Sequence, residues 1–204
     1  NVSEYNNHTD IVLLELLSPL LPGGSIEIST PFRVVLPEVF SRLGHHEQAY
    51  QISQWYPKPA VYDLRGWHPM PYLDQGEFFS EYGNYTVNIT LPANYVTAAT
   101  GDLQTESEKQ FLNTRILRND TTLLTKLAKN PASDPNYKTI TFKQQQVHDF
   151  AWFANKQFVI EKTTDTLPSG KQTDCYSFFP PAEKRFYDSS SLTIAKTIHY
   201  LSTH

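Results

Sequence analysis

Residues 85–92 read Tyr-Thr-Val-Asn-Ile-Thr-Leu-Pro, and apolar and polar side chains alternate along them without interruption. Successive side chains of a β-strand point to opposite faces of the sheet. We therefore expect Tyr85, Val87, Ile89 and Leu91 to face a core, while the three polar residues between them face solvent. One buried face and one wet face are typical of an antiparallel sheet.

Further strands are predicted on both sides of this segment, bounded by Pro, Gly, Asn and Ser. They cover residues 11–17, 25–29, 32–36, 51–59 with its terminating prolines, 95–99, 111–118, 137–146 and 153–163. Within residues 25–29, Ile26 and Ile28 alternate with polar residues, which predicts a half-buried strand. A short helical turn is predicted over residues 38–43. The fold class predicted from these patterns is mainly β, an antiparallel sheet or sandwich.

The end of the chain has a different pattern. Three serines at 189–191 offer helix caps, and Leu192, Ala195, Ile198 and Leu201 then recur at helical spacing. This predicts a C-terminal α-helix that runs to residue 204 without a stop signal. Because its apolar stripe has little left to pack on, we expect the natural chain to continue into another domain.

Composition excludes several classes of protein. The 204 residues are 39% hydrophobic and 19% charged, with a formal net charge of -4. No excess of Lys and Arg exists to neutralise a nucleic-acid backbone, so nucleic acid is not an expected partner. The 12 Phe, 12 Tyr and 3 Trp are too many buryable rings for a disordered chain. No apolar run is long enough for a membrane span.

Metal-binding and nucleophilic motifs are scarce. His46 and Glu47 begin an H-E-x-x-H-like fragment, but its last position is Tyr50, a poor zinc ligand, so a solvent-exposed loop is the better interpretation. The single cysteine, Cys175, lies in a predicted strand and is expected to be a buried, inert thiol. No nucleophile elbow, phosphate loop or dinucleotide fingerprint occurs. We therefore predict no catalytic residue, no metal ligand and no cofactor in this chain.

Two other features have more than one interpretation. His148 beside Asp149 is interpreted as a buried, hydrogen-bonded pair with a structural role. Rings and prolines are concentrated in residues 55–72, and residues 60–76 are predicted to form an ordered, aromatic-rich loop. Exposed rings such as Trp55, Trp67 and Tyr72 can stack on a ligand, although aromatic strands more often belong to a core.

Several segments together resemble the aminopeptidase N-like zinc metallopeptidases, of the gluzincin type. The strongest are SQWYPKPAVYD at 53–63 and GWHPMPY at 66–72. Residues 18–23 are similar to the family's turn ahead of a strand, and residues 85–92 and 95–101 to its paired strands. HDFAWFA at 148–154 is similar to the "DFAW" end of its β-domain, and residues 186–204 to the first helix of its catalytic domain.

The resemblance implies a particular domain organisation. Residues 1–162 would be the back part of a saddle-type antiparallel β-domain, and residues 163–204 the truncated start of the catalytic domain. The family's H-E-x-x-H zinc helix and its G-x-M-E-N strand lie downstream of the helix that ends here. Zinc is therefore expected only in the full-length parent, and this chain alone is expected to be inactive.

One substrate-binding role is implied for residues of this chain. In the family a T-Q-x-Q/E segment presents an amide or carboxylate to the free amino terminus of a peptide, an ammonium group that needs fixed acceptors. Gln54 and Tyr56 occupy the two matching positions. Since the second is normally Gln or Glu, the resemblance does not extend to strict aminopeptidase specificity. The alternative interpretation is that both residues only pack the sheet.

Three functional hypotheses follow from these observations. The first is the upstream, non-catalytic part of a zinc metallopeptidase, which scaffolds and lines a peptide-binding cleft beside its downstream catalytic domain. The second is a stand-alone β-sandwich that binds carbohydrate or protein through its aromatic loop. The third is a pure scaffold without substrate contact. A periplasmic or extracellular location is expected from the kind of relative, and low cysteine use fits the cytoplasm equally well.

Overall fold

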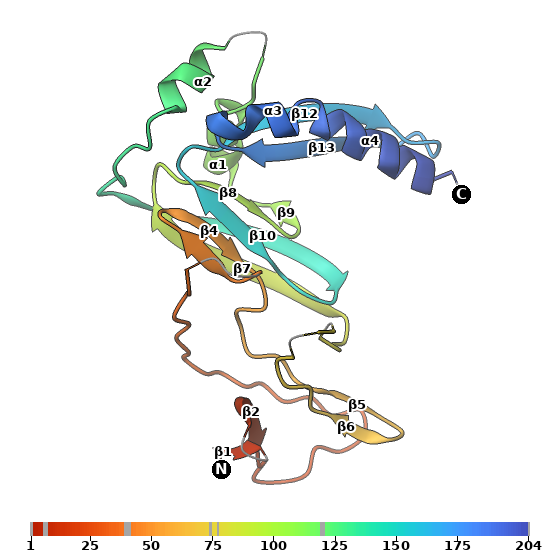
Figure 1. Ribbon diagram of the computed structural model, residues 1–204. Helices are drawn as coiled ribbons and strands as arrows, with labels where there is room; N and C mark the ends of the chain where they lie inside the picture. Colours follow the sequence, from red (N-terminus) through yellow and green to blue (C-terminus); the bar gives the residue numbers. More distant parts are fainter. Residues whose placement is uncertain are drawn as a thin grey trace.

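The computed structural model describes residues 2–5, 8–38, 42–73, 75–76, 78–118 and 121–203. It is mainly β, with several antiparallel sheets and a C-terminal helix, which confirms the predicted fold class. Figure 1 shows an extended N-terminal region, a central group of strands, and a hairpin with helices that ends at the C-terminus.

The first central sheet has the order β7-β10-β9. Strand β7 (Gly83–Pro92) runs antiparallel to β10 (Tyr137–Val147), and Ile89 lies opposite Ile140. Burial along β7 alternates as the sequence predicts, because every second side chain enters the core. The short strand β9 (Asp102–Leu103) pairs with the other edge of β10.

The second central sheet has the order β3-β4-β11-β8 and is also antiparallel. Its strands are β3 (Gly44–His46), β4 (Ala49–Ile52), β11 (Trp152–Asn155) and β8 (Val96–Ala99). One buried hydrophobic cluster joins the two central sheets. It contains Ile89 and Phe142 from the first, Ala154 from the second, and Phe150 from the loop before β11.

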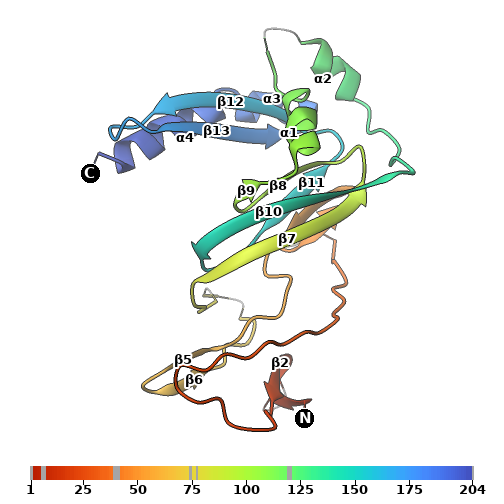
Figure 2. The same cartoon turned by 180° about the vertical axis from the view of Figure 1, so that it is seen from behind.

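A hairpin of β12 (Val159–Thr166) and β13 (Gln172–Phe179) follows, with a short 3₁₀ turn η1 (Pro181–Glu183) and helix α3 (Lys184–Tyr187) after it. Helix α4 (Ser190–Leu201) then packs along both strands of the hairpin, as both views show (Figure 2). The predicted C-terminal helix is therefore confirmed. Its buried residues are Ser191 and Ala195, whereas Leu192 and Leu201 stay exposed. The domain boundary expected between residues 162 and 163 falls within β12 and stays a prediction.

The prediction of a strand over residues 111–118 is wrong. Helix α1 (Glu106–Asn113) covers the first part of that range, and α2 (Thr122–Leu127) follows. Glu106 and Glu108 lie in the first turn of α1, where carboxylates favour the positive end of a helix. Only Ile116 keeps a β-type contact, an isolated bridge to Ile160.

The N-terminal region departs furthest from the sequence prediction. After the hairpin of β1 (Val2–Tyr5) and β2 (His8–Leu14), the described chain has no strand over residues 15–37, so the strands predicted at 25–29 and 32–36 are wrong. Ile26 and Ile28 are 49% and 59% exposed. Alternation needs a hydrogen-bonded neighbouring strand to form a sheet, and these residues pair with no strand in the described part of the chain. The helical turn predicted at 38–43 falls largely outside the described residues.

The predicted aromatic loop contains a small hairpin of its own, β5 (Val61–Asp63) and β6 (Gly66–His68). Among the described residues no helix is long and apolar enough to cross a membrane.

Candidate functional site

Gln54 and Tyr56 lie directly after β4, where the chain leaves the second central sheet. Gln54 has a φ of 54°, in the left-handed region that a residue with a Cβ rarely occupies. Such strain persists only where surrounding contacts hold it. The contacts made by the next two residues, Trp55 and Tyr56, supply that constraint.

The Tyr56 hydroxyl lies 2.8 Å from Asp149 Oδ1 and 2.8 Å from the Tyr85 hydroxyl. A tyrosine has one proton to donate, and a carboxylate only accepts, so Tyr56 donates to Asp149. The Tyr85 hydroxyl also lies 3.2 Å from the carbonyl of His148. Tyr56 is thus held between β7 and the segment that precedes β11.

Lys58 supplies the positive charge of this group. Its Nζ lies 3.3 Å from Asp149 Oδ1 and 5.5 Å from the centre of the Tyr56 ring. Asp149 Oδ1 accepts a further hydrogen bond from the backbone N–H of Phe150, at 2.8 Å. Tyr56, Lys58, Tyr85 and Asp149 form what we call the Tyr56 cluster. The half-buried ammonium of Lys58 and the half-buried carboxylate of Asp149 therefore lie side by side, next to two phenol rings.

Burial raises the pKa of Tyr56 well above its usual value, and the hydrogen bonds to Tyr85 and Asp149 raise it further. A phenol in this state stays protonated at every physiological pH. It can donate a hydrogen bond and hold a neighbour in place, but it cannot serve as a general base. The cluster is therefore suited to positioning rather than to proton transfer.

Trp55 ties the same two segments together a second time. Its Nε1 donates to the carbonyl of Phe150 at 3.0 Å, and its ring lies edge-on to Tyr56, with 5.2 Å between centroids. Because Trp55 is half-buried and engaged in this way, it does not belong to an exposed stacking surface. This is a correction to the aromatic-loop interpretation, in which Trp55 was one of the exposed rings.

The structure treats the two predicted substrate-side residues differently. Tyr56 is bonded into the cluster, whereas the half-buried side chain of Gln54 makes no hydrogen bond within the described part of the chain. An amide in that state keeps its oxygen and its N–H groups for another partner. Whether either residue contacts a substrate stays a prediction.

Sequence reasoning missed Lys58, Tyr85 and the role of Asp149. Asp149 was expected to pair with His148, but its carboxylate contacts Tyr56, Lys58 and a backbone N–H instead, while the His148 ring packs on Tyr82 at 4.2 Å. Residues 56 and 149 are 93 positions apart. No local sequence pattern predicts a contact between residues so far apart. The one feature that could have drawn attention to this site is Lys58, a charged residue between two prolines.

A second aromatic group lies on the β5–β6 hairpin. The rings of Tyr62 and Trp67 are 4.9 Å apart, and each residue is 65% exposed. At the base of the hairpin, His68 Nε2 lies 2.8 Å from Asp63 Oδ1, and this contact lowers the pKa of Asp63 together with a hydrogen bond from the N–H of Arg65. The hairpin therefore presents two paired rings to solvent on a held backbone.

No group of three or more His, Cys, Asp or Glu residues suited to a metal occurs in the ranges that the structure describes. His46 is exposed at the end of β3, and Glu47 adopts a left-handed conformation in the turn before β4. Cys175 is buried in β13, as expected, and burial raises the pKa of its thiol, with Asp165 and Asp174 adding to the shift. A neutral, covered thiol is a poor nucleophile.

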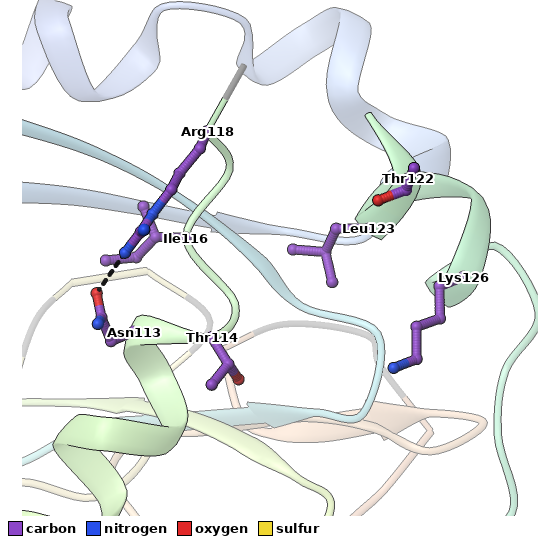
Figure 3. Close-up of a pocket in the computed structure, with 7 residues that line it drawn as sticks. All are labelled: Asn113, Thr114, Ile116, Arg118, Thr122, Leu123 and Lys126. Atoms are coloured by element: carbon purple, nitrogen blue, oxygen red, sulfur yellow. Dashed lines mark hydrogen bonds between the residues drawn. The ribbon is translucent and has the colours of Figure 1, made fainter. Parts of the chain in front are cut away.

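Two surface hollows stand apart from Gln54 and Tyr56. One, of about 580 Å³, lies between α2 and the end of α1 (Figure 3). The other, of about 650 Å³, lies between α4 and β12 and includes His199, whose Nδ1 is 2.9 Å from Asp165 Oδ2. Neither is lined by any residue of the Tyr56 cluster.

Comparison with known proteins gives no relative. No family model, no curated protein and no solved structure matches this chain.

Proposed function

We propose that this chain is the non-catalytic upstream portion of a zinc-dependent metallopeptidase of the aminopeptidase type, which scaffolds and lines the peptide-binding cleft. The observation that carries the proposal is the contact between two of the segments that resemble the family, residues 53–63 and residues 148–154. Tyr56 of the first segment bonds to Asp149 of the second, and Trp55 bonds to Phe150. Two segments that are far apart in the sequence, and that resemble the same family, are thus in contact in the fold.

In this proposal the Tyr56 cluster holds Gln54 just beyond the end of β4, in the second central sheet. The amide oxygen of Gln54 accepts a hydrogen bond from the ammonium group of a peptide, and Tyr56 fixes the backbone that presents it. An acceptor on a sheet-anchored segment is better placed than one on a free loop. The zinc ion and its ligands belong to the downstream catalytic domain of the same polypeptide, and the protein acts in the periplasm or outside the cell.

The kinetic test uses the full-length gene product, which should hydrolyse aminoacyl and peptidyl chromogenic substrates in a zinc-dependent manner. Gln54→Ala removes the proposed ammonium acceptor, so we expect KM for a substrate with a free amino terminus to rise by at least about tenfold, because a hydrogen bond to a charged group contributes about 1.5 kcal/mol or more. For the N-acetylated substrate, which has no ammonium group, KM should change by less than twofold.

Gln110→Ala is the matched control, because Gln110 is an exposed glutamine on α1. It should leave both substrates unaffected. If Gln54→Ala and Tyr56→Phe both leave peptide turnover unchanged, the substrate-side assignment is wrong and the scaffold interpretation holds. If the reading frame stops near residue 204, or encodes no H-E-x-x-H helix beyond it, the peptidase proposal itself fails.

The exposed ring pair on the β5–β6 hairpin favours a second function, binding of carbohydrate or protein by this chain as a stand-alone module. Paired exposed rings such as Tyr62 and Trp67 suit stacking on a sugar face. Titration with oligosaccharides should then change the tryptophan fluorescence of the wild-type chain and leave that of Trp67→Ala unchanged. A lack of any saturable signal in the wild type would remove this alternative.

A further inference from the structure

The hollow between α1 and α2 has an apolar floor and a cationic rim. Ile116 and Leu123 are half-buried and form the floor, whereas Arg118 and Lys126 are exposed on opposite walls. Asn113, Thr114 and Thr122 are the other described residues that line it. None of the seven lining residues that the structure describes is acidic, in a chain whose formal net charge is -4.

The two cations make few contacts with the described residues. Within the described ranges, the guanidinium of Arg118 makes one hydrogen bond, from Nη2 to Asn113 Oδ1 at 3.3 Å, out of the five N–H donors it carries. The ammonium of Lys126 makes no hydrogen bond or ion pair within the described residues, and it extends from α2 across the hollow towards the wall that holds Thr114 (Figure 3). Elsewhere Lys58, Lys138, Lys162 and Lys184 are all paired with a carboxylate.

The C-terminus of α1, which lies beside the hollow, repels an anion only weakly. The negative end of α1 faces this region, but the carbonyl of Phe111 accepts hydrogen bonds from the N–H of Thr114, at 3.0 Å, and from its hydroxyl, at 2.6 Å. The carbonyl of Leu112 accepts from the N–H of Arg115 at 2.9 Å. Occupied carbonyls present less negative potential to a ligand.

From these observations we propose that the hollow binds a small organic anion, whose carboxylate or phosphate group lies between Arg118 and Lys126 and whose apolar body covers Ile116 and Leu123. A volume of about 580 Å³ accommodates a ligand of several carbon atoms, within the range of small-molecule sites. A bare inorganic anion would leave the apolar floor wet, so the class is amphipathic. This site is independent of the peptidase function proposed above.

Isothermal titration of the intact protein with hexanoate, hexyl phosphate, acetate and hexylammonium tests the proposal. We expect hexanoate or hexyl phosphate to bind saturably, and the stronger of the two identifies the headgroup. Acetate should bind at least tenfold more weakly than hexanoate, because each buried methylene contributes about fourfold. Hexylammonium should not bind, and added salt should weaken both anions.

Arg118→Gln and Lys126→Gln should each weaken binding of the favoured anion by about fivefold, and the double variant should abolish it. Arg65→Gln and Lys171→Gln are matched controls, because both residues are exposed and lie outside the hollow; they should bind as the wild type does. All four side chains are exposed, so folding is not at stake. Absence of saturable binding, or binding that the double variant retains, overturns the proposal.

Discussion

At the scale of single residues, the Tyr56 cluster links segments that are far apart in the sequence. Tyr56 contacts β7 through Tyr85 and the segment before β11 through Asp149. Asp149 keeps Lys58 and the N–H of Phe150 as further partners. Asp149 therefore has other partners when Tyr56 is changed, whereas the Tyr56 hydroxyl contacts Tyr85 on one side and Asp149 on the other.

Tyr56→Phe removes that hydroxyl and keeps the ring. We expect the free energy of unfolding to fall by about 1.5 kcal/mol, the usual contribution of a hydrogen bond to a charged group. Urea denaturation of this chain measures it. Tyr137→Phe is the control, because Tyr137 is 69% exposed and the change should stay below about 0.5 kcal/mol. Equal effects of the two variants would contradict the structural role of the Tyr56 hydroxyl.

Gly101 occupies a place that only glycine fits. Its φ is +89°, and a Cβ built on it would lie 2.5 Å from the carbonyl oxygen of Lys143. Gly170 has a similar φ of +82° with nothing within 4 Å of that position. Gly101→Ala should therefore destabilise the chain by at least about 2 kcal/mol more than Gly170→Ala. Both variants carry the strain of a positive φ, but only the Cβ at position 101 would overlap another atom, the carbonyl oxygen of Lys143. Thermal denaturation of both variants checks the difference.

At the scale of elements, one buried ion pair fastens α1 to the first central sheet. Lys138 Nζ on β10 lies 2.8 and 2.7 Å from the two carboxylate oxygens of Glu108, and 2.7 Å from the carbonyl of Tyr95. Glu108 is 2% exposed, and the Phe111 ring lies 4.0 Å from the ammonium. This contact gives a physical reason why residues 106–113 form a helix that packs here.

Glu108→Gln leaves the ammonium of Lys138 buried without its countercharge, and such losses cost about 3–5 kcal/mol. Glu106→Gln, on the exposed side of α1, should cost less than about 0.5 kcal/mol, because its pair with Lys109 is a surface pair. Urea denaturation measures both variants. The double variant Glu108→Leu/Lys138→Met should recover much of the loss. A small effect of Glu108→Gln would show that the pair does not hold α1.

The β12–β13 hairpin carries a pH-dependent contact. Asp174 accepts hydrogen bonds from Lys162, at 2.8 Å, and from the hydroxyl of Thr164, at 2.6 Å, and both lower the pKa of its carboxyl. Because the pKa of Asp174 is lower in the folded state, its ionised form stabilises the fold at any pH above the pKa of an unfolded Asp, about 4. That stabilisation is lost as the pH falls through the folded-state pKa. In Asp174→Asn the urea midpoint should therefore decrease less between about pH 5 and pH 2 than it does in the wild type. Asp102→Asn, at an exposed position, should leave that decrease unchanged.

At the scale of the whole molecule, the hydrophobic contacts are unevenly distributed. The two central sheets share one core cluster, and a smaller cluster joins α2 to the last hairpin through Leu127, Val159 and Phe179. Residues 15–37 contribute to neither of these buried sets. Leu17, Leu21 and Val35 are 106%, 73% and 78% exposed. A segment with few buried contacts opens at little cost in free energy.

Limited proteolysis of this 204-residue chain with subtilisin should therefore cut first within residues 15–37, and mass spectrometry of the early fragments locates the cuts. Strands β7 and β10 should remain intact at that stage, because their side chains form the central core. First cleavage inside β7 or β10 would contradict this distribution of stability.

The sequence by itself determined those features that depend on local patterns. Alternation over residues 85–92 identified β7, and helical spacing after residue 188 identified α4, because a side chain's direction follows from its place in a strand or helix. The strand predicted at residues 137–146 is β10. The same alternation at residues 25–29 formed no strand, because none of the strands in the described ranges pairs with these residues. Only the tertiary structure decided that residues 106–113 are a helix, which side of α4 is buried, and that Tyr56 meets Asp149. Each of these depends on a contact between residues that are distant in the chain. Composition and periodicity do not predict such contacts.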